Sequence, residues 1–190
     1  MKEKYVNIHQ DLIDACRAGD RDAQFRIYKL YYKAMYNTSL RIVNDTAEAE
    51  DIMQESFLDA FRRIGSYTGE GSFGSWLKRI VVNRSLDHLR KTKEMVSLDE
   101  VGAEVPDSDD SYPEEEIRGR VEDVMRAIAQ LPVDYRVIIN LILVEGYDHE
   151  EVSGILNITN QLSRTRYSRA RQRLLETIRA NDLKKSFSIN

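Results

Sequence analysis

The apolar residues of this chain recur at spacings of three and four, and no segment alternates apolar and polar residues as a half-buried strand would. This pattern predicts helices throughout. In the first half the repeats are carried by residues 12–16, 25–36, 49–64 and 76–89. Gly19 follows the first of these segments and Asn44-Asp45 the second, and these residue types commonly end a helix or begin the next one.

The third segment has both a start signal and a charged side. Asp45 is followed three residues later by Glu48, which is the spacing of a capping box, where a side-chain oxygen satisfies a free N–H of the first turn. The side of this helix that faces away from its apolar residues carries an acidic stripe made of Glu48, Asp51, Glu55 and Asp59. Charges on a helix are usually solvated surface, so a partner for this stripe needs independent support.

The fourth segment follows a glycine-rich loop, residues 65–74, and combines aromatic with basic residues. Phe73 and Trp76 are either core aromatics or platforms on which unpaired bases stack, and the basic side chains beside them favour contact with a single strand of DNA. Two apolar sides predict two packing neighbours for this helix. One side is made of Trp76, Leu77, Ile80 and Val81, and the other of Val82, Leu86 and Leu89.

From about residue 93 to residue 116 the chain is acidic, holds two of its three prolines and loses its apolar periodicity. Such a segment buries too little surface to offset the entropy lost on ordering. We therefore expect an all-α protein with two small helical domains joined by a flexible acidic linker. The predicted parts are a first domain over residues 1–92, the linker over 93–116, a second domain over 117–182 and a disordered tail over 183–190.

The second half of the chain predicts a helix-turn-helix after two further helices, one over residues 117–131 and one that begins at Pro132 and ends at Gly146. Asp148 with Glu151 has the spacing of a second capping box, which opens a short helix. Asn157-Ile158-Thr159 then forms a tight turn before the final helix.

The final helix is a candidate reader of duplex DNA. Its packing face is expected to consist of Tyr167, Ala170, Leu174 and Ile178. Arginines and hydroxyl groups are left outward, and arginine can fork onto guanine edges or phosphates in the major groove. The alternative is a solvated basic helix that pairs with the acidic linker, but the short helix and turn that precede it favour DNA.

Composition narrows the class of protein further. The chain has 190 residues, of which 42% are hydrophobic and 32% charged, with a formal net charge of −4, as in ordinary globular proteins. No apolar run suits a secretion signal or a membrane span, which favours a cytoplasmic protein. The single cysteine, Cys16, is expected to be a small buried side chain. The histidines are scattered, and phosphate-binding, metalloprotease and nucleophile motifs are lacking. We therefore expect that the chain is no enzyme and needs no cofactor or metal.

Three stretches together resemble the sigma-70 family of initiation factors, in its extracytoplasmic-function (ECF) group. They are AEAEDIMQESFLDAFRRI, YTGEGSFGSWLKRIVVNRSLDHLRK and LPVDYRVIINLILVEGYDHEEVSGILNITNQLSRTRYSRARQRL, in the family's order. The resemblance implies a sigma factor of the bacterial cytoplasm that binds core RNA polymerase, recognises minus-35 and minus-10 promoter elements and promotes strand opening. It also suggests an anti-sigma factor as a partner, and no insertion into a membrane.

The resemblance assigns residues as well. In the family, the helix that resembles DIMQESF docks on the clamp of the polymerase's largest subunit, which implies core contacts for Asp51, Gln54 and Glu55. The loop from Tyr67 to Ser75 and the next helix resemble the parts that capture an unpaired base and bind the minus-10 element. The contacts implied there are Phe73, Trp76, Lys78, Arg79, Asn83 and Arg84. The final helix resembles the minus-35 reader, with Arg164, Thr165 and Ser168 at base edges and Arg166, Arg169 and Arg171 near phosphates.

The start of the final helix departs from the family. Members commonly have glycine, threonine and valine where this chain has Gln161, Leu162 and Ser163, so an inward apolar side chain is lost and Leu162 is expected to turn inward instead. An alternative function is that of a helix-turn-helix repressor or activator that never joins the polymerase. Such a protein would use its first domain for dimerisation or effector sensing, and association with core polymerase distinguishes the two functions.

Overall fold

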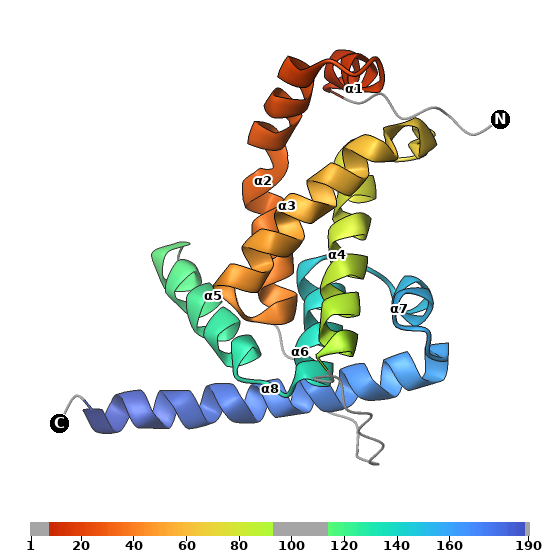
Figure 1. The fold of residues 1–190 in the computed structure, drawn as a ribbon. Coiled ribbons are helices and arrows are strands. Elements are labelled where there is room, and N and C mark those ends of the chain that lie inside the picture. The colour runs from red at the N-terminus through yellow and green to blue at the C-terminus, as the bar shows by residue number, and fades with distance from the viewer. Residues whose placement is uncertain (1–7, 93–113, 189–190) are drawn as a thin grey trace. The chain divides into compact units, whose positions relative to one another are not determined.

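The computed structural model describes the backbone of residues 8–92 and 114–188, and the side chains of residues 8–92 and 120–182. The chain divides into two compact units, Met1–Lys93 and Glu94–Asn190. Within the described ranges every regular element is a helix, as the sequence predicts (Figure 1). The first unit contains α1 (Gln10–Arg17), α2 (Arg21–Val43), α3 (Thr46–Arg62), the 3-10 turn η1 (Ile64–Ser66) and α4 (Phe73–Lys91). The second contains α5 (Glu114–Ala129), α6 (Val133–Ile139), the π-helical turn η2 (Asn140–Val144), α7 (His149–Leu156) and α8 (Asn160–Ser188).

The helix ends of the first unit follow the local signals of the sequence. Gly19, after α1, has a φ of +86°, and Asn44, after α2, has a φ of +62°, so both adopt the left-handed conformation that stops a helix. The Asp45 carboxylate accepts hydrogen bonds from the backbone N–H groups of Ala47 and Glu48 at 2.9 and 3.0 Å. The Glu48 carboxylate lies 3.3 Å from His88 Nδ1 of α4. Of the capping box predicted here, the structure therefore shows the Asp45 half, while Glu48 contacts α4.

The core of the first unit lies where α2, α3 and α4 pack on one another. Its most buried members include Ile13, Ile27, Met53, Phe57, Phe73, Leu77 and Val81. α4 packs against both α2 and α3, which confirms the two neighbours predicted from its two apolar sides. Cys16 is buried as expected, and burial raises the pKa of its thiol, with the charge of Asp20 acting in the same direction.

The second unit is built on α8, against which α5, α6 and α7 pack. Asp148 caps α7 through the backbone N–H groups of Glu150 and Glu151, and the Glu151 carboxylate accepts from the Asp148 N–H, so the predicted capping box is confirmed. Asn157 ends α7 with a φ of +56°. The Thr159 hydroxyl oxygen accepts from the Leu162 N–H at 3.1 Å at the start of α8. The predicted helix, turn and helix are therefore present.

The structure differs from the sequence prediction at both outer ends of the second unit. α5 begins at Glu114, inside the predicted linker, and residues 93–113 of that linker lie outside the described residues. α8 continues to Ser188, so the prediction of a disordered tail was wrong for residues 183–188. The physical reason is that no glycine or proline follows residue 160, while leucine and lysine, both good helix formers, occupy residues 183–185. In the part of the chain that the structure describes, none of the helices combines the length and the apolar character that a bilayer crossing requires.

Candidate nucleic-acid interface

The three residues predicted to contact the polymerase lie on α3 and are all exposed. They are Asp51, Gln54 and Glu55. The Gln54 side-chain amide donates to Glu50 Oε1 at 3.2 Å, one turn earlier on the same helix. The Glu55 carboxylate is 63% exposed, although it is also paired with Arg84 of α4. A partner can therefore reach this acidic face without any rearrangement of the core.

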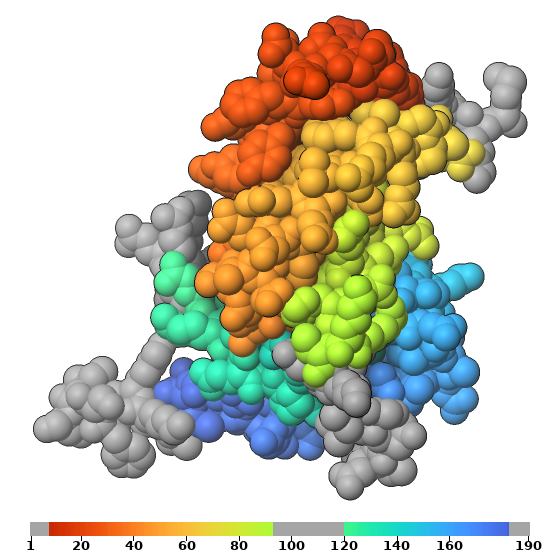
Figure 2. Space-filling model, viewed as in Figure 1, coloured from red at the N-terminus to blue at the C-terminus, as the bar shows by residue number. Residues whose placement is uncertain are grey.

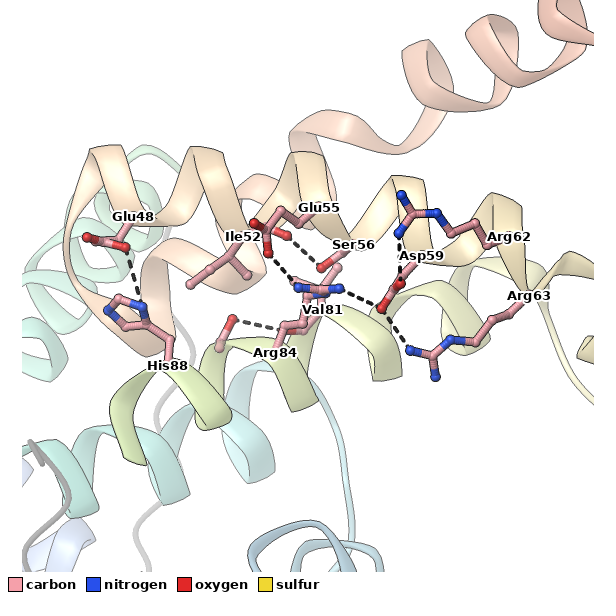
Figure 3. A network of polar contacts seen from close by, with 11 residues as sticks. Glu48, Ile52, Glu55, Ser56, Asp59, Arg62, Arg63, Val81, Arg84 and His88 are labelled. Carbon is pink, nitrogen blue, oxygen red and sulfur yellow. Dashed lines mark hydrogen bonds and ion pairs between the residues drawn. The ribbon is translucent and has the colours of Figure 1, made fainter. Parts of the chain in front are cut away.

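Arg84 joins α4 to two carboxylates of α3 (Figure 3). Its Nη1 lies 2.5 Å from Glu55 Oε2, and its Nη2 lies 2.6 Å from Asp59 Oδ2. Asp59 is only 14% exposed and also receives Arg63 Nη2 at 2.8 Å. The hydrogen bond from Arg84 lowers the pKa of the Asp59 carboxyl, aided by the charges of Arg84 and Arg63 and opposed by burial. Asp59 is therefore held as a carboxylate.

A polar hollow of about 470 Å³ lies between α3 and α4, which are neighbours on the face shown in Figure 2. α3 lines it with Glu55 and Asp59, and α4 lines it with Asn83, Arg84 and Lys91, among other residues. Members of the predicted core-binding set and of the predicted minus-10 set thus meet in one depression. Sequence reasoning missed Asp59 as part of this site, because its partner Arg84 lies on another helix.

The basic residues predicted to contact the minus-10 strand lie along α4. Arg79 and Asn83 are exposed, whereas Lys78 and Arg84 are half-buried. Trp76 is half-buried as well, with its ring 5.5 Å from that of Tyr67 and 5.4 Å from that of Phe73.

Phe73 lies in the buried core of the first unit. It is 1% exposed, and its ring is surrounded by those of Tyr31, Tyr67 and Trp76, whose centroids lie 5.4 to 5.6 Å away. A buried ring offers no face to a base, so a strand contact through Phe73 stays a prediction that would require its ring to become exposed. The sequence left open whether Phe73 is a core aromatic or a stacking platform, and in the structure it is a core aromatic.

The loop before α4 is held in place by its own contacts and by α1. The Tyr67 hydroxyl donates to the Gly71 carbonyl at 2.6 Å, and Gly69 and Gly71 have positive φ angles of 82° and 104°. The Ser72 hydroxyl caps α4 by accepting from the Ser75 N–H at 3.0 Å. From α1, Arg17 Nη2 donates to the Tyr67 carbonyl at 2.6 Å. Arg17 is a second residue that sequence reasoning missed, since nothing near it in the chain signals a contact with this loop.

The residues predicted to read base edges lie at the start of α8. Arg164 is exposed and its Nε donates to Asn160 Oδ1 at 2.9 Å, while Thr165 and Ser168 are half-buried. Of the predicted phosphate contacts, Arg169 and Arg171 are half-buried. Arg166 is only 8% exposed, so a phosphate contact through this residue would require its side chain to move outward.

The unusual start of α8 is accommodated by a polar pair. Ser163, and not Leu162, takes the fully buried position, and its hydroxyl lies 2.9 Å from Nδ1 of His149 at the start of α7. The His149 ring also meets that of Tyr167 edge to face at 5.5 Å. Burial lowers the pKa of His149, as does the nearby charge of Arg164, while Asp148 acts in the opposite direction. Leu162 is half-buried, and the fully inward position is taken by Ser163, whose hydroxyl His149 satisfies.

The fold and these surfaces define a class of protein. It is a two-part helical DNA-binding protein, with a helix-turn-helix in one unit and a basic helix beside an exposed acidic helix in the other. Among the described side chains, no group of three or more histidine, cysteine, aspartate or glutamate residues is arranged to hold a metal ion.

Comparisons with known proteins agree with this class. Residues 27–94 match the family model for sigma-70 region 2, and residues 122–174 match that for sigma-70 region 4. The ECF RNA polymerase sigma factor SigW of Bacillus subtilis is 31% identical over 180 residues, which covers 88% of this chain and 95% of SigW. The RNA polymerase sigma-H factor of Pseudomonas aeruginosa is 30% identical over 173 residues, covering 86% of this chain and 90% of that factor.

Solved structures show the same fold. CnrH, in complex with the cytosolic domain of CnrY, has a TM-score of 0.56 at 18% identity and covers 90% of this chain and 97% of its own. The sigma factor RpoE of Bartonella quintana, in complex with the anti-sigma factor NepR, has a TM-score of 0.55 at 22% identity, covering 81% of this chain and 95% of its own. The chain belongs to the ECF group of the sigma-70 family and is a transcription initiation factor. The repressor alternative is not favoured, because both sigma regions are matched and not the helix-turn-helix alone.

Proposed function

We propose that this sigma factor binds core RNA polymerase through the exposed face of α3 that carries Asp51, Gln54 and Glu55. The observation that supports this most is the exposure of all three residues on a helix with an acidic stripe. A basic surface on the polymerase would complement them. The same face lies outside the apolar core, so substitutions there are expected to change binding and leave folding intact.

The DNA contacts are proposed on two helices. On α4, Lys78, Arg79, Asn83 and Arg84, with the exposed part of Trp76, meet the minus-10 strand, while Phe73 supports them from the core. On α8, Arg164, Thr165 and Ser168 face the base edges of the minus-35 element, with Arg169 and Arg171 near phosphates. Arginine and hydroxyl side chains are suited to base edges in the major groove, and basic side chains to a strand backbone. In this function the chain acts in the bacterial cytoplasm and leaves the covalent chemistry to the polymerase.

An anti-sigma factor is a further proposed partner. CnrH and the Bartonella quintana RpoE were both solved in complexes, the second with a protein that is described as an anti-sigma factor. This chain shares their fold. A protein that covers α3 or α8 would block the polymerase or the promoter, and it would keep the factor inactive until released.

The experiment that tests the core-binding face compares a charge reversal on α3 with one on α1. Asp51→Arg is expected to weaken association with core polymerase and to reduce transcription from factor-dependent promoters at least tenfold, because it places like charge against a basic partner. Asp11→Arg, at an exposed position of α1 away from the proposed face, is the control and should retain most activity. Pull-down of core polymerase and start-site mapping in reconstituted transcription measure both. Equal loss in the two variants, or wild-type protein that never redirects initiation, would contradict the proposal.

A further inference from the structure

One ion pair links the two surfaces of the first unit that the proposed function assigns to different partners. Glu55 belongs to the face proposed for core polymerase, and Arg84 to the helix proposed for the minus-10 strand. In the structure the two side chains bind each other, with Arg84 Nη1 2.5 Å from Glu55 Oε2 (Figure 3). Neither side chain can give its full charge to an outside partner while this pair is made.

The two carboxylates that hold Arg84 are unequal. Asp59 is 14% exposed and holds Nη2 at 2.6 Å from the inner side of the network, where Arg63 also binds it. Glu55 is 63% exposed and holds Nη1 from the outer side. The bond to Asp59 holds one end of the guanidinium, Nη2, against α3. The bond to Glu55 is accessible to solvent and to a partner. Glu55 is therefore the carboxylate that can leave Arg84 for another partner while Asp59 stays bound.

The hollow beside Glu55 has room and basic side chains for a DNA strand. The hollow of about 470 Å³ between α3 and α4 is lined by Arg84 together with Asn83, His88 and Lys91 of α4. A phosphate or base edge that enters the hollow meets these donors, and it also meets the carboxylates of Glu55, Asp59 and Asp87, which repel phosphate. Withdrawing Glu55 lessens the repulsion, since Asp59 and Asp87 remain, and it releases one edge of the Arg84 guanidinium in the same event.

We propose that the Glu55–Arg84 ion pair couples core binding to DNA binding: a basic partner that takes the Glu55 carboxylate frees Arg84 for the DNA strand. The inference rests on the proposed function for which partner meets which surface. Coupling of this kind is reciprocal, so a strand that draws Arg84 away also makes Glu55 more available to the polymerase. An ion pair with an exposed partner is weak, so the effect is about two- to fivefold in affinity and acts as a bias, not a lock.

The test uses the full chain without polymerase and a short fluorescent single-stranded oligonucleotide of mixed sequence, with affinity measured by anisotropy at low salt. Glu55→Gln is expected to bind the strand about two- to fivefold more tightly than Glu50→Gln. Both variants remove one negative charge from α3, so the general effect of net charge cancels in the comparison. Equal affinities of the two variants would overturn the proposal.

A second comparison shows whether Arg84 carries the effect. In an Arg84→Gln background the difference between Glu55→Gln and Glu50→Gln should vanish, and a difference that persists would contradict the role of Arg84. Circular dichroism establishes whether the Arg84→Gln chain is folded, and the first comparison decides the matter without that variant if it is not. None of these measurements involves polymerase. A chain that directs initiation but shows equal affinities rejects the coupling alone, whereas failure to redirect initiation rejects the proposed function.

Discussion

At the scale of single residues, Asp59 is the side chain on which the α3–α4 network depends. It is largely buried, and it accepts from both Arg84 and Arg63. The Arg84 hydrogen bond holds the pKa of Asp59 below its usual value. A carboxyl whose pKa is lower in the folded than in the unfolded chain adds stability above the unfolded pKa, about 4, and this stability is lost as the pH falls through the folded pKa.

We therefore predict that Asp59→Asn lowers the free energy of unfolding at neutral pH and flattens its decline in acid. The reason is that the variant has lost the group that must be protonated there. Glu50→Gln, where the carboxylate accepts from Gln54 and not from an arginine, is the control and should keep the wild-type acid profile. Urea unfolding at a series of pH values from neutral to about 3 measures both, since that range spans the unfolded carboxyl pKa. An unchanged acid slope in Asp59→Asn would contradict the prediction.

At the scale of elements, the joint between α7 and α8 depends on a side-chain hydrogen bond between the two helices. Ser163 is fully buried and its hydroxyl meets His149 Nδ1 at 2.9 Å. A buried polar group that loses its partner costs about 1–3 kcal/mol. The pair therefore sets how the first turn of α8, with Arg164, is held against α7.

The pair can be tested by two substitutions of nearly equal shape. Ser163→Thr keeps the hydroxyl, whereas Ser163→Val replaces it with a methyl group and leaves His149 Nδ1 without this partner. We predict that the valine variant is less stable than the threonine variant by about 1–3 kcal/mol. Amide hydrogen exchange in the first turn of α8 should also be faster in the valine variant. Equal stability and exchange in the two variants would show that the hydroxyl is not needed.

The features that could be predicted from the sequence are those set by neighbours in the chain. The Asp148–Glu151 capping box and the turn at Asn157 were correct because a cap is decided within four residues. The pairing of Arg84 with Asp59 joins two helices, and no local pattern specifies it. Phe73 was ambiguous for a similar reason, since periodicity places an aromatic ring on a helix but does not say whether the loop around Tyr67 covers it.

At the scale of the whole molecule, the basic side chains proposed for DNA lie in two separate units, and the formal net charge of the chain is −4. Each unit alone offers a small contact surface, and the overall charge opposes approach to DNA. The polymerase, by binding the factor, would bring both units to one promoter and convert two modest affinities into one stronger one.

We predict weak promoter binding by the purified chain, with dissociation constants in the micromolar range or above, which is typical of sequence-independent contacts. Adding core polymerase should strengthen binding at least a hundredfold, as expected when the second contact becomes intramolecular. Anisotropy titrations of a promoter duplex, with and without core enzyme and at two salt concentrations, measure the difference. Nanomolar, sequence-selective binding by the chain alone would contradict this account.

The hydrogen bond between Arg17 and the Tyr67 carbonyl affects where the first unit can be truncated. The match to sigma-70 region 2 begins at residue 27, so a fragment trimmed to that boundary would lack α1 altogether. It would also lose the guanidinium that steadies the loop before α4, fifty positions further along. Such a fragment would keep every side chain proposed to contact the strand, but the loop that precedes their helix would be less firmly held.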